Sequence, residues 1–253
     1  MGSLENTGCK VNGIKINHLT KVFGGVRAVD DLTISIAHGK ATGLIGPNGS
    51  GKTTLMNLIT GLLKPDCGTI EIGNDTFDSI NPQTLRDLRI ARTFQDGRLV
   101  DQLSVDDNLL LAIAENETGK SLLQINTNSM QERLDKTLKK IGLTAHRKKM
   151  AEELSYGQRK LLELGRALIQ DADIYLLDEP FSGLFAKQID NVLNLIAGLK
   201  ESKKTIVIIE HNMGLIKRVA DKLIVLDHGQ LLASGSPDVV LKNKSVQQAY
   251  LGV

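Results

Sequence analysis

The residues best suited to chemistry form a glycine-rich segment, 46–54, that reads GPNGSGKTT. It fits the pattern G-x-x-x-x-G-K-[ST], which holds the phosphates of a nucleoside triphosphate. Its glycines allow positive φ and leave room for backbone N–H groups to converge on phosphate oxygens. Lys52 is expected to reach the β- and γ-phosphates, and Thr53 to ligate Mg²⁺ through its hydroxyl. The predicted nucleotide-binding residues of this loop are Gly46, Pro47, Asn48, Gly49, Ser50, Gly51, Lys52, Thr53 and Thr54.

The segments on either side of this loop support the same interpretation. Residues 41–45 are short, apolar and bounded by glycine, which predicts a buried strand. A helix starting near Lys52 would point its positive end at the bound anion. The alternative is a glycine-rich loop that binds nothing. It is disfavoured because the complete G-x-x-x-x-G-K-[ST] pattern lies between a predicted strand and a predicted helix.

Two adjacent carboxylates follow another apolar run. Residues 174–177 predict a strand, and Asp178 and Glu179 come directly after it. At the carboxyl end of a parallel strand beside a phosphate-binding loop, Asp178 suits Mg²⁺ through its water shell. Glu179 can orient the attacking water and is the candidate general base. An acidic pair at a strand end is otherwise often a solvated turn.

The segment 154–158 reads LSYGQ and opens a predicted helix that runs to Ile169. Ser155 is suited to cap the N-terminus of this helix. Gly157 in the first turn costs about 1 kcal/mol relative to alanine unless close backbone approach requires it. A capped amphipathic helix is the alternative, but an exposed helix end with a hydroxyl and glycine amides is also suited to a phosphate.

Together, the glycine-rich loop and LSYGQ resemble ATP-binding cassette (ABC) proteins, in which one subunit's signature caps the nucleotide on its partner's P-loop. The resemblance implies ATP and Mg²⁺ as cofactors, and a homodimer or a heterodimer with a second ATP-binding subunit. It also implies that Ser155, Gly157 and Gln158 contact the nucleotide of the opposing subunit.

Three further positions take roles only from this resemblance. His211 matches the switch histidine that contacts the γ-phosphate, although a lone histidine after a strand is more often structural. Gln95 matches the Q-loop glutamine, which helps to position Mg²⁺ and water and links the site to a helical subdomain. Phe23 matches the aromatic residue that stacks on adenine, with burial in the core as its alternative. Phe185 departs from the pattern, because many ABC proteins have an acidic residue there and amino-acid relatives often have Asn. This departure puts the usual polar contact across the dimer in doubt.

The order of the predicted elements indicates an α/β protein. We expect a P-loop NTPase (RecA-like) core, an N-terminal antiparallel β subdomain and an inserted α-helical subdomain at about 96–170, all within one nucleotide-binding domain, 1–253. The predicted strands are 14–19, 32–36, 41–45, 69–72, 89–94, 174–177, 205–209 and 223–226. The predicted helices are 52–63, 105–114, 130–141 and 155–169, with two more starting at Ala186 and Met213.

Composition limits the partners. The 253 residues carry a net charge of +2 and only 3% aromatic residues, which argues against a nucleic-acid partner. No apolar stretch approaches the ~20 residues that span a bilayer. Two isolated cysteines indicate a reducing compartment. The resemblance to ABC proteins, and not the composition, implies transmembrane permease subunits as partners, attachment through them at the cytoplasmic face of the inner or plasma membrane, and a periplasmic or extracellular solute-binding protein. Residues 96–101 are expected to form part of the groove that receives a permease helix.

Several short sequence segments resemble, more specifically, the ATP-binding subunits of branched-chain amino-acid importers. They are residues 23–26, 93–95 with 98–99, 209–213 and 249–252. ATPases of urea import and lipopolysaccharide export share most of them, and the transported molecule does not touch this subunit. A DNA-repair or chromosome-structure ABC ATPase would need a long coiled-coil insertion, and residues 54–154 hold no sustained heptad pattern. A translation factor of the ABC type would normally carry two cassettes, and a nucleotide kinase or GTPase would lack the signature helix.

Overall fold

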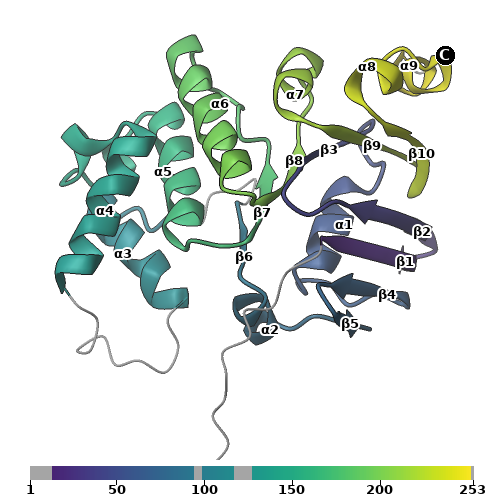
Figure 1. The fold of residues 1–253 in the computed structure, drawn as a ribbon, viewed down its shortest axis with the longest axis horizontal. Coiled ribbons are helices and arrows are strands. Elements are labelled where there is room, and N and C mark those ends of the chain that lie inside the picture. Colours follow the sequence, from purple (N-terminus) through teal and green to yellow (C-terminus); the bar gives the residue numbers. More distant parts are fainter. Residues whose placement is uncertain (1–12, 94–98, 117–126, 252–253) are drawn as a thin grey trace, which may run out of the picture.

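The central element of the computed structural model is a six-stranded sheet, and the structure describes residues 13–93, 99–116 and 127–251 (Figure 1). Every neighbouring pair of strands in this sheet is parallel except β10 and β9. In spatial order the strands are β10 (Gln230–Gly235), β9 (Lys222–Asp227), β3 (Ala41–Ile45), β8 (Thr205–Ile209), β7 (Ile174–Asp178) and β6 (Ile90–Arg92).

Both faces of this sheet are buried, which explains why its strands are continuous apolar runs in the sequence. Because side chains alternate along a strand, Ile206 and Ile208 pack into one core, and Val207 and Ile209 pack into a second. The first core holds the helices of the insertion and of the C-terminal half. The second holds helix α1 and the N-terminal sheet.

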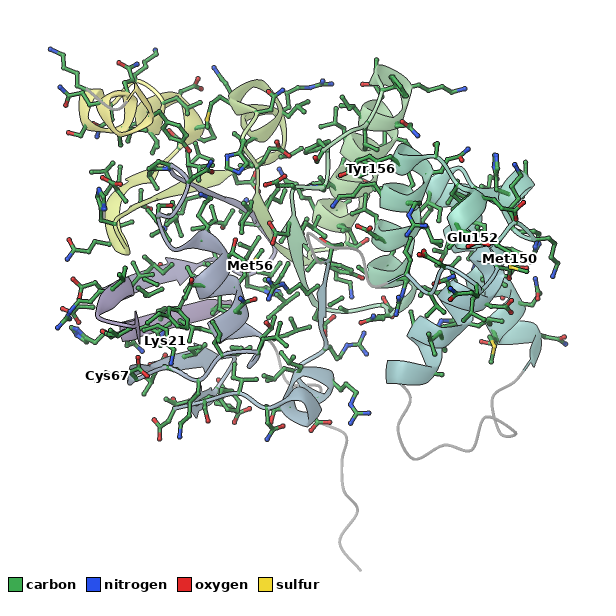
Figure 2. The ribbon with its side chains drawn as sticks, turned by 180° about the vertical axis from the view of Figure 1, so that it is seen from behind. Lys21, Met56, Cys67, Met150, Glu152 and Tyr156 are labelled. Carbon is green, nitrogen blue, oxygen red and sulfur yellow. The ribbon has the colours of Figure 1, made fainter. Side chains whose placement is uncertain are left out.

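The second sheet is antiparallel, in the order β2–β1–β4–β5. Its strands are β1 (Ile14–Phe23), β2 (Val26–Ile36), β4 (Cys67–Ile72) and β5 (Asp75–Phe77). Helix α1 (Lys52–Ile59) packs between the two sheets, where Leu55, Met56 and Ile59 are buried (Figure 2). The N-terminal sheet therefore holds in place the helix that follows the glycine-rich loop.

The remaining helices form two groups. On the left of Figure 1, α3 (Val105–Asn116), α4 (Thr127–Ile141) and α5 (Tyr156–Ile169) pack together as a helical unit. The others are α2 (Pro82–Asp87), α6 (Ala186–Glu201), α7 (Met213–Val219), α8 (Pro237–Val240) and α9 (Lys244–Leu251). Among the residues described, no helix combines the length and the apolar character needed to cross a membrane.

The predicted fold class is confirmed, with differences at element ends. Strand β1 continues to Phe23 beyond the expected Leu19, through irregularities in its pairing with β2 that interrupt the alternating pattern. Helix α1 ends at Ile59 instead of Leu63, and Gly61 then adopts φ 66°. The expected strand 89–94 is described only as β6. The short elements β5, α2, α8 and α9 and the strand β10 were not predicted, because their few residues carry little periodic signal.

Candidate active site

The glycine-rich loop connects the end of β3 to the start of α1, as predicted. Gly46, Gly49 and Gly51 have φ of 150°, 78° and 100°. Two of them are also places of close approach. A Cβ at Gly46 would lie 2.1 Å from the Leu226 carbonyl oxygen, and one at Gly51 would lie 2.2 Å from that of Ala28. Glycine is therefore required at both positions by conformation and by packing.

Lys52 lies folded over its own loop. Its Nζ donates hydrogen bonds to the carbonyl oxygens of Gly46 and Pro47, both at 2.8 Å. The side chain is buried, and this burial lowers the pKa of Lys52, opposed by the nearby carboxylates of Asp178 and Glu179. Within the loop the buried ammonium is bonded only to neutral oxygens, which an anionic ligand could replace as acceptors.

Asp178 is the last residue of β7 and is buried. Its backbone N–H donates to Thr93 Oγ1 at 2.9 Å. Its Oδ2 has no hydrogen-bond partner in the described residues and forms an ion pair with Arg92 Nη2 at 3.9 Å. Burial raises the pKa of Asp178, and the charge of Arg92 opposes that shift. A buried carboxylate oxygen without a hydrogen bond is costly, and a bound cation would satisfy it.

Glu179 follows in a left-handed conformation, with φ 46°, which is uncommon for a residue other than glycine. Its N–H donates to the Ile209 carbonyl at 3.0 Å, so the adjacent strand β8 holds this turn. Its Oε1 lies 3.2 Å from Nε2 of His211. The sheet order places β7 beside β8, and the two side chains that follow these strands therefore meet.

His211 is held by its neighbours on both sides. The Glu210 carboxylate accepts hydrogen bonds from the backbone N–H groups of His211 and Asn212, both at 3.0 Å. The Asn212 side chain in turn caps the N-terminus of α7 by accepting from the Leu215 N–H. The backbone at His211 is therefore fixed on both sides, with the imidazole left to face Glu179.

These groups line one hollow of about 340 Å³. Its walls come from the glycine-rich loop, the start of α1, strand β2 and the ends of β7 and β8. The lining residues are Ala28, Asn48, Gly49, Gly51, Lys52, Thr53, Thr54, Asp178, Glu179, Ile209 and His211. The Thr53 hydroxyl and the Asp178 carboxylate are oxygen donors of the kind that Mg²⁺ prefers, so the donor set fits this ion. Most of the predicted residues are thus brought together, and Ala28 and Ile209 are additions.

The LSYGQ segment lies at the N-terminus of α5. Ser155 is the N-cap, as predicted, and forms a capping box with Gln158. The predicted close approach at Gly157 is found inside this chain, because a Cβ there would lie 2.8 Å from the side-chain amide of Gln188. Ser155 and Tyr156 are exposed, and Figure 2 shows Tyr156 beside α6. In the described part of the chain, none of the LSYGQ residues lines the 340 Å³ hollow.

The two other predicted positions have different outcomes. Phe23 ends β1 and is 45% exposed, so the core alternative is wrong. Lys21 Nζ lies 5.5 Å from the centre of the Phe23 ring (Lys21 in Figure 2). Gln95 lies outside the described residues, as does Arg98 of the expected permease groove.

Sequence reasoning missed three side chains around Asp178. Thr93 accepts its N–H, Arg92 forms the ion pair, and Lys160 Nζ lies 3.4 Å from its carbonyl oxygen. Arg92 also donates to the side chains of Asn57 and Thr60, at 2.7 and 2.9 Å. A charged residue in the middle of a predicted buried strand was the available signal for Arg92, since a buried charge needs partners.

Comparison with known proteins agrees with this geometry. Residues 29–182 match the family model described as ABC transporter. The chain is 36% identical to the high-affinity branched-chain amino acid transport ATP-binding protein LivG of Escherichia coli (strain K12), covering 94% of this chain and 97% of LivG. It is 32% identical to BraF of Pseudomonas aeruginosa, a protein with the same description, over the same shares.

Solved structures extend the likeness to three dimensions. A nucleotide-free ATP-binding cassette from an ABC transporter superposes with a TM-score of 0.84 at 32% identity, covering 95% of this chain and 99% of that one. The ADP conformation of MJ1267, an ATP-binding cassette of an ABC transporter, gives 0.81 at 34% identity over the same shares. The chain therefore belongs to the ABC transporter family, as one of its ATP-binding and ATP-hydrolysing subunits.

Proposed function

We propose that this ABC ATPase powers the import of a small polar solute, with branched-chain amino acids as the leading candidates, through ATP-driven closure of a dimer. The observation that carries the ATPase role is the single hollow shared by Lys52, Thr53, Asp178, Glu179 and His211. The substrate class rests on LivG and BraF, which are similar over nearly the whole chain. Urea import and lipopolysaccharide export remain the alternative functions.

The glycine-rich loop holds the phosphates in this proposal. Lys52 leaves its carbonyl acceptors and turns to the β- and γ-phosphates, while backbone N–H groups and the N-terminus of α1 contribute further positive charge. Thr53 and Asp178, with Gln95, hold Mg²⁺, which when bound neutralises charge on the phosphate oxygens. The exposed ring of Phe23 stacks on adenine.

Glu179 and His211 act on the hydrolytic water and the γ-phosphate. Glu179 orients the water and accepts its proton, since its carboxylate lines the hollow beside Lys52 and Thr53. His211 lies within 3.2 Å of Glu179 and contacts the γ-phosphate from the end of β8. The contact between the two side chains orients the carboxylate for this role.

A second nucleotide-binding subunit completes the site, as a homodimer or a heterodimer. Ser155, with Gly157 and Gln158, is offered to the nucleotide on that partner, because Ser155 is exposed at the N-terminus of α5. In the single chain Gly157 is buried against Gln188. The positive end of a helix favours a phosphate there. The exposed side chains of Tyr156 and Phe185 would then be covered by the partner.

The permease contacts are assigned to the helical subdomain, at about 96–170 within one domain that spans 1–253. Asp101, which ends the expected docking segment, pairs with Arg159 of α5 at 2.6 Å and so connects that segment to the signature helix. Nearby, Met150 is exposed and Glu152 donates its N–H to the Asp101 carbonyl, at the outer end of the helical unit in Figure 2. This mixed surface suits a permease helix at the cytoplasmic face of a membrane, with a solute-binding protein on the other side.

Uptake into vesicles tests the transported substrate. The chain would be reconstituted with permease subunits and a solute-binding protein chosen from its genomic neighbours, and ATP-dependent uptake of labelled leucine and urea would be compared. Leucine uptake that disappears in the Glu179→Gln variant supports the proposal. Urea uptake, or ATP-dependent release of a lipid, would replace the substrate assignment without affecting the ATPase.

A further inference from the structure

The C-terminal helix α9 reaches back to the glycine-rich loop through one side chain. The Tyr250 hydroxyl accepts a hydrogen bond from the backbone N–H of Gly46 at 2.6 Å, across 204 positions of sequence. In the described residues, this is the hydrogen bond that joins α9 to the loop. Residues 249–252 were singled out by the sequence analysis, and the ATPase chemistry leaves them without a role.

The Gly46 N–H needs an acceptor from outside the sheet. Strand β3 pairs with β8 as far as Leu44 and with β9 as far as Ile45, so Gly46 is the first residue beyond both ladders. Gly46 is buried, and a buried N–H without a partner is costly. The phenol oxygen of Tyr250 therefore accepts from this N–H at the point where the chain leaves the sheet and enters the glycine-rich loop.

Tyr250 lies on α9, a helix that packs against the core through Val246. Val246, one turn earlier in α9, is 2% exposed and belongs to the core on the helix-covered face of the sheet. Although 36% of Tyr250 is exposed, its hydroxyl lies against the loop, and the desolvation there raises the pKa of Tyr250 to about 12, so the hydroxyl stays neutral over the physiological range. The hydroxyl is thus held at the loop by the packing of α9.

The rest of α9 stands away from the loop. A hollow of about 420 Å³ separates them, lined by the loop on one side, by α9 on the other and by the turn after β9. Its lining residues are Pro47, Asn48, Gly49, Ser50, Asp227, His228, Ser245, Gln248 and Ala249. The contact through Tyr250 is therefore a point contact at the first residue of the loop.

Both backbone polar groups of Gly46 are hydrogen-bonded. Its carbonyl accepts from Lys52 and its N–H donates to Tyr250. When Lys52 turns to a phosphate, the carbonyl loses that donor, whereas the Tyr250 bond does not involve Lys52. We propose that Tyr250 is a positioning residue for the phosphate-binding loop, and that α9 holds Gly46 in its phosphate-binding conformation through this hydroxyl.

The Tyr250→Phe variant tests this role, because it keeps the ring and removes the oxygen. We expect about tenfold weaker binding of Mg-ATP by calorimetric titration, the scale of one lost hydrogen bond with an unpaired donor. The KM for ATP should rise with kcat nearly unchanged, because the lost contact acts on binding rather than on the chemical step. Amide hydrogen exchange of the Gly46 N–H in the protein without nucleotide should be faster.

Gln248→Ala is the matched control, since Gln248 lies on α9 and lines the hollow without a hydrogen bond to the loop. It should bind Mg-ATP as the unmodified chain does. Equal affinity and equal exchange in Tyr250→Phe would overturn the proposal. The same loss in Gln248→Ala would overturn it too, because the packing of α9 and not the hydroxyl would then be responsible. A lower thermal midpoint with unchanged ATP affinity would also count against a positioning role.

Discussion

The phosphate-binding loop and the N-terminus of α5 both present helix ends suited to a phosphate, but this chain surrounds them differently. Around the loop, Lys52 and Ser50 are buried and hydrogen-bonded within the chain. Around the N-terminus of α5, Tyr156 is 62% exposed and the nearby Phe185 is 81% exposed. The glycine-rich loop has its polar groups bonded within one chain, whereas the N-terminus of α5 has its capping residues in place and an uncovered outer surface. Nucleotide binding and nucleotide turnover should therefore be separable by mutation.

Glu179→Gln should have the largest effect. The amide keeps the shape of the side chain and can still accept from His211, but it cannot act as a base. Hydrolysis should fall by about 10²-fold or more, the usual range for loss of a general base. ATP should then accumulate and drive dimerisation, which light scattering with Mg-ATP would detect. A variant that stays monomeric at high concentration, alone and with its homologous partner subunit, would contradict the clamp.

Lys52→Ala tests the glycine-rich loop, which is the enclosed region of the two. The bound phosphates lose their nearest cation, and the affinity for ATP should fall by about 10- to 100-fold, the scale of hydrogen bonds to charged groups. Calorimetric titration measures the loss. Lys40→Ala is a suitable control, because Lys40 is an exposed lysine just before β3. Unchanged ATP affinity in Lys52→Ala would mean that the loop does not hold the phosphates.

Ser155→Arg tests the N-terminus of α5, which is the exposed region of the two. The large side chain should block the opposing nucleotide site and lower turnover by about tenfold or more, while the monomer binds ATP normally. Loss of the N-cap should also lower the free energy of unfolding by about 1 kcal/mol. Ser202→Arg, at the exposed C-cap of α6, controls for the added charge and bulk. Lost ATP binding by the monomeric Ser155→Arg variant would show that Ser155 belongs to its own chain's site.

Phe185→Asn should have the smallest effect on the single chain. Phe185 is exposed, so the free energy of unfolding should change by no more than about 0.5 kcal/mol. The substitution supplies a polar group where the resemblance places a contact across the dimer, and the ATP dependence of hydrolysis should become more cooperative. Steady-state rates over a range of ATP concentrations measure this. An unchanged Hill coefficient would show that Phe185 does not limit coupling between the two sites.

What could be predicted from the sequence was set by short-range spacing. The positive φ of Gly46, Gly49 and Gly51 and the N-cap at Ser155 depend on residues only a few positions away. The pattern of a strand followed directly by Asp178 and Glu179 is likewise defined by consecutive residues. Such features survive in any fold that keeps the segment intact, because a loop or cap is defined by its own backbone geometry.

Contacts between distant segments were decided by the tertiary structure. The order β3–β8–β7 brings His211 to Glu179 and both to the loop. Thr93 reaches the Asp178 N–H across 85 positions, and Tyr250 reaches Gly46 across 204. No local pattern encodes these pairs, because they depend on which strands are neighbours and on where α9 packs. The sequence by itself therefore determined the glycine-rich loop and the acidic pair at the end of β7, and only the packing of sheet and helices decided which side chains hold them in place.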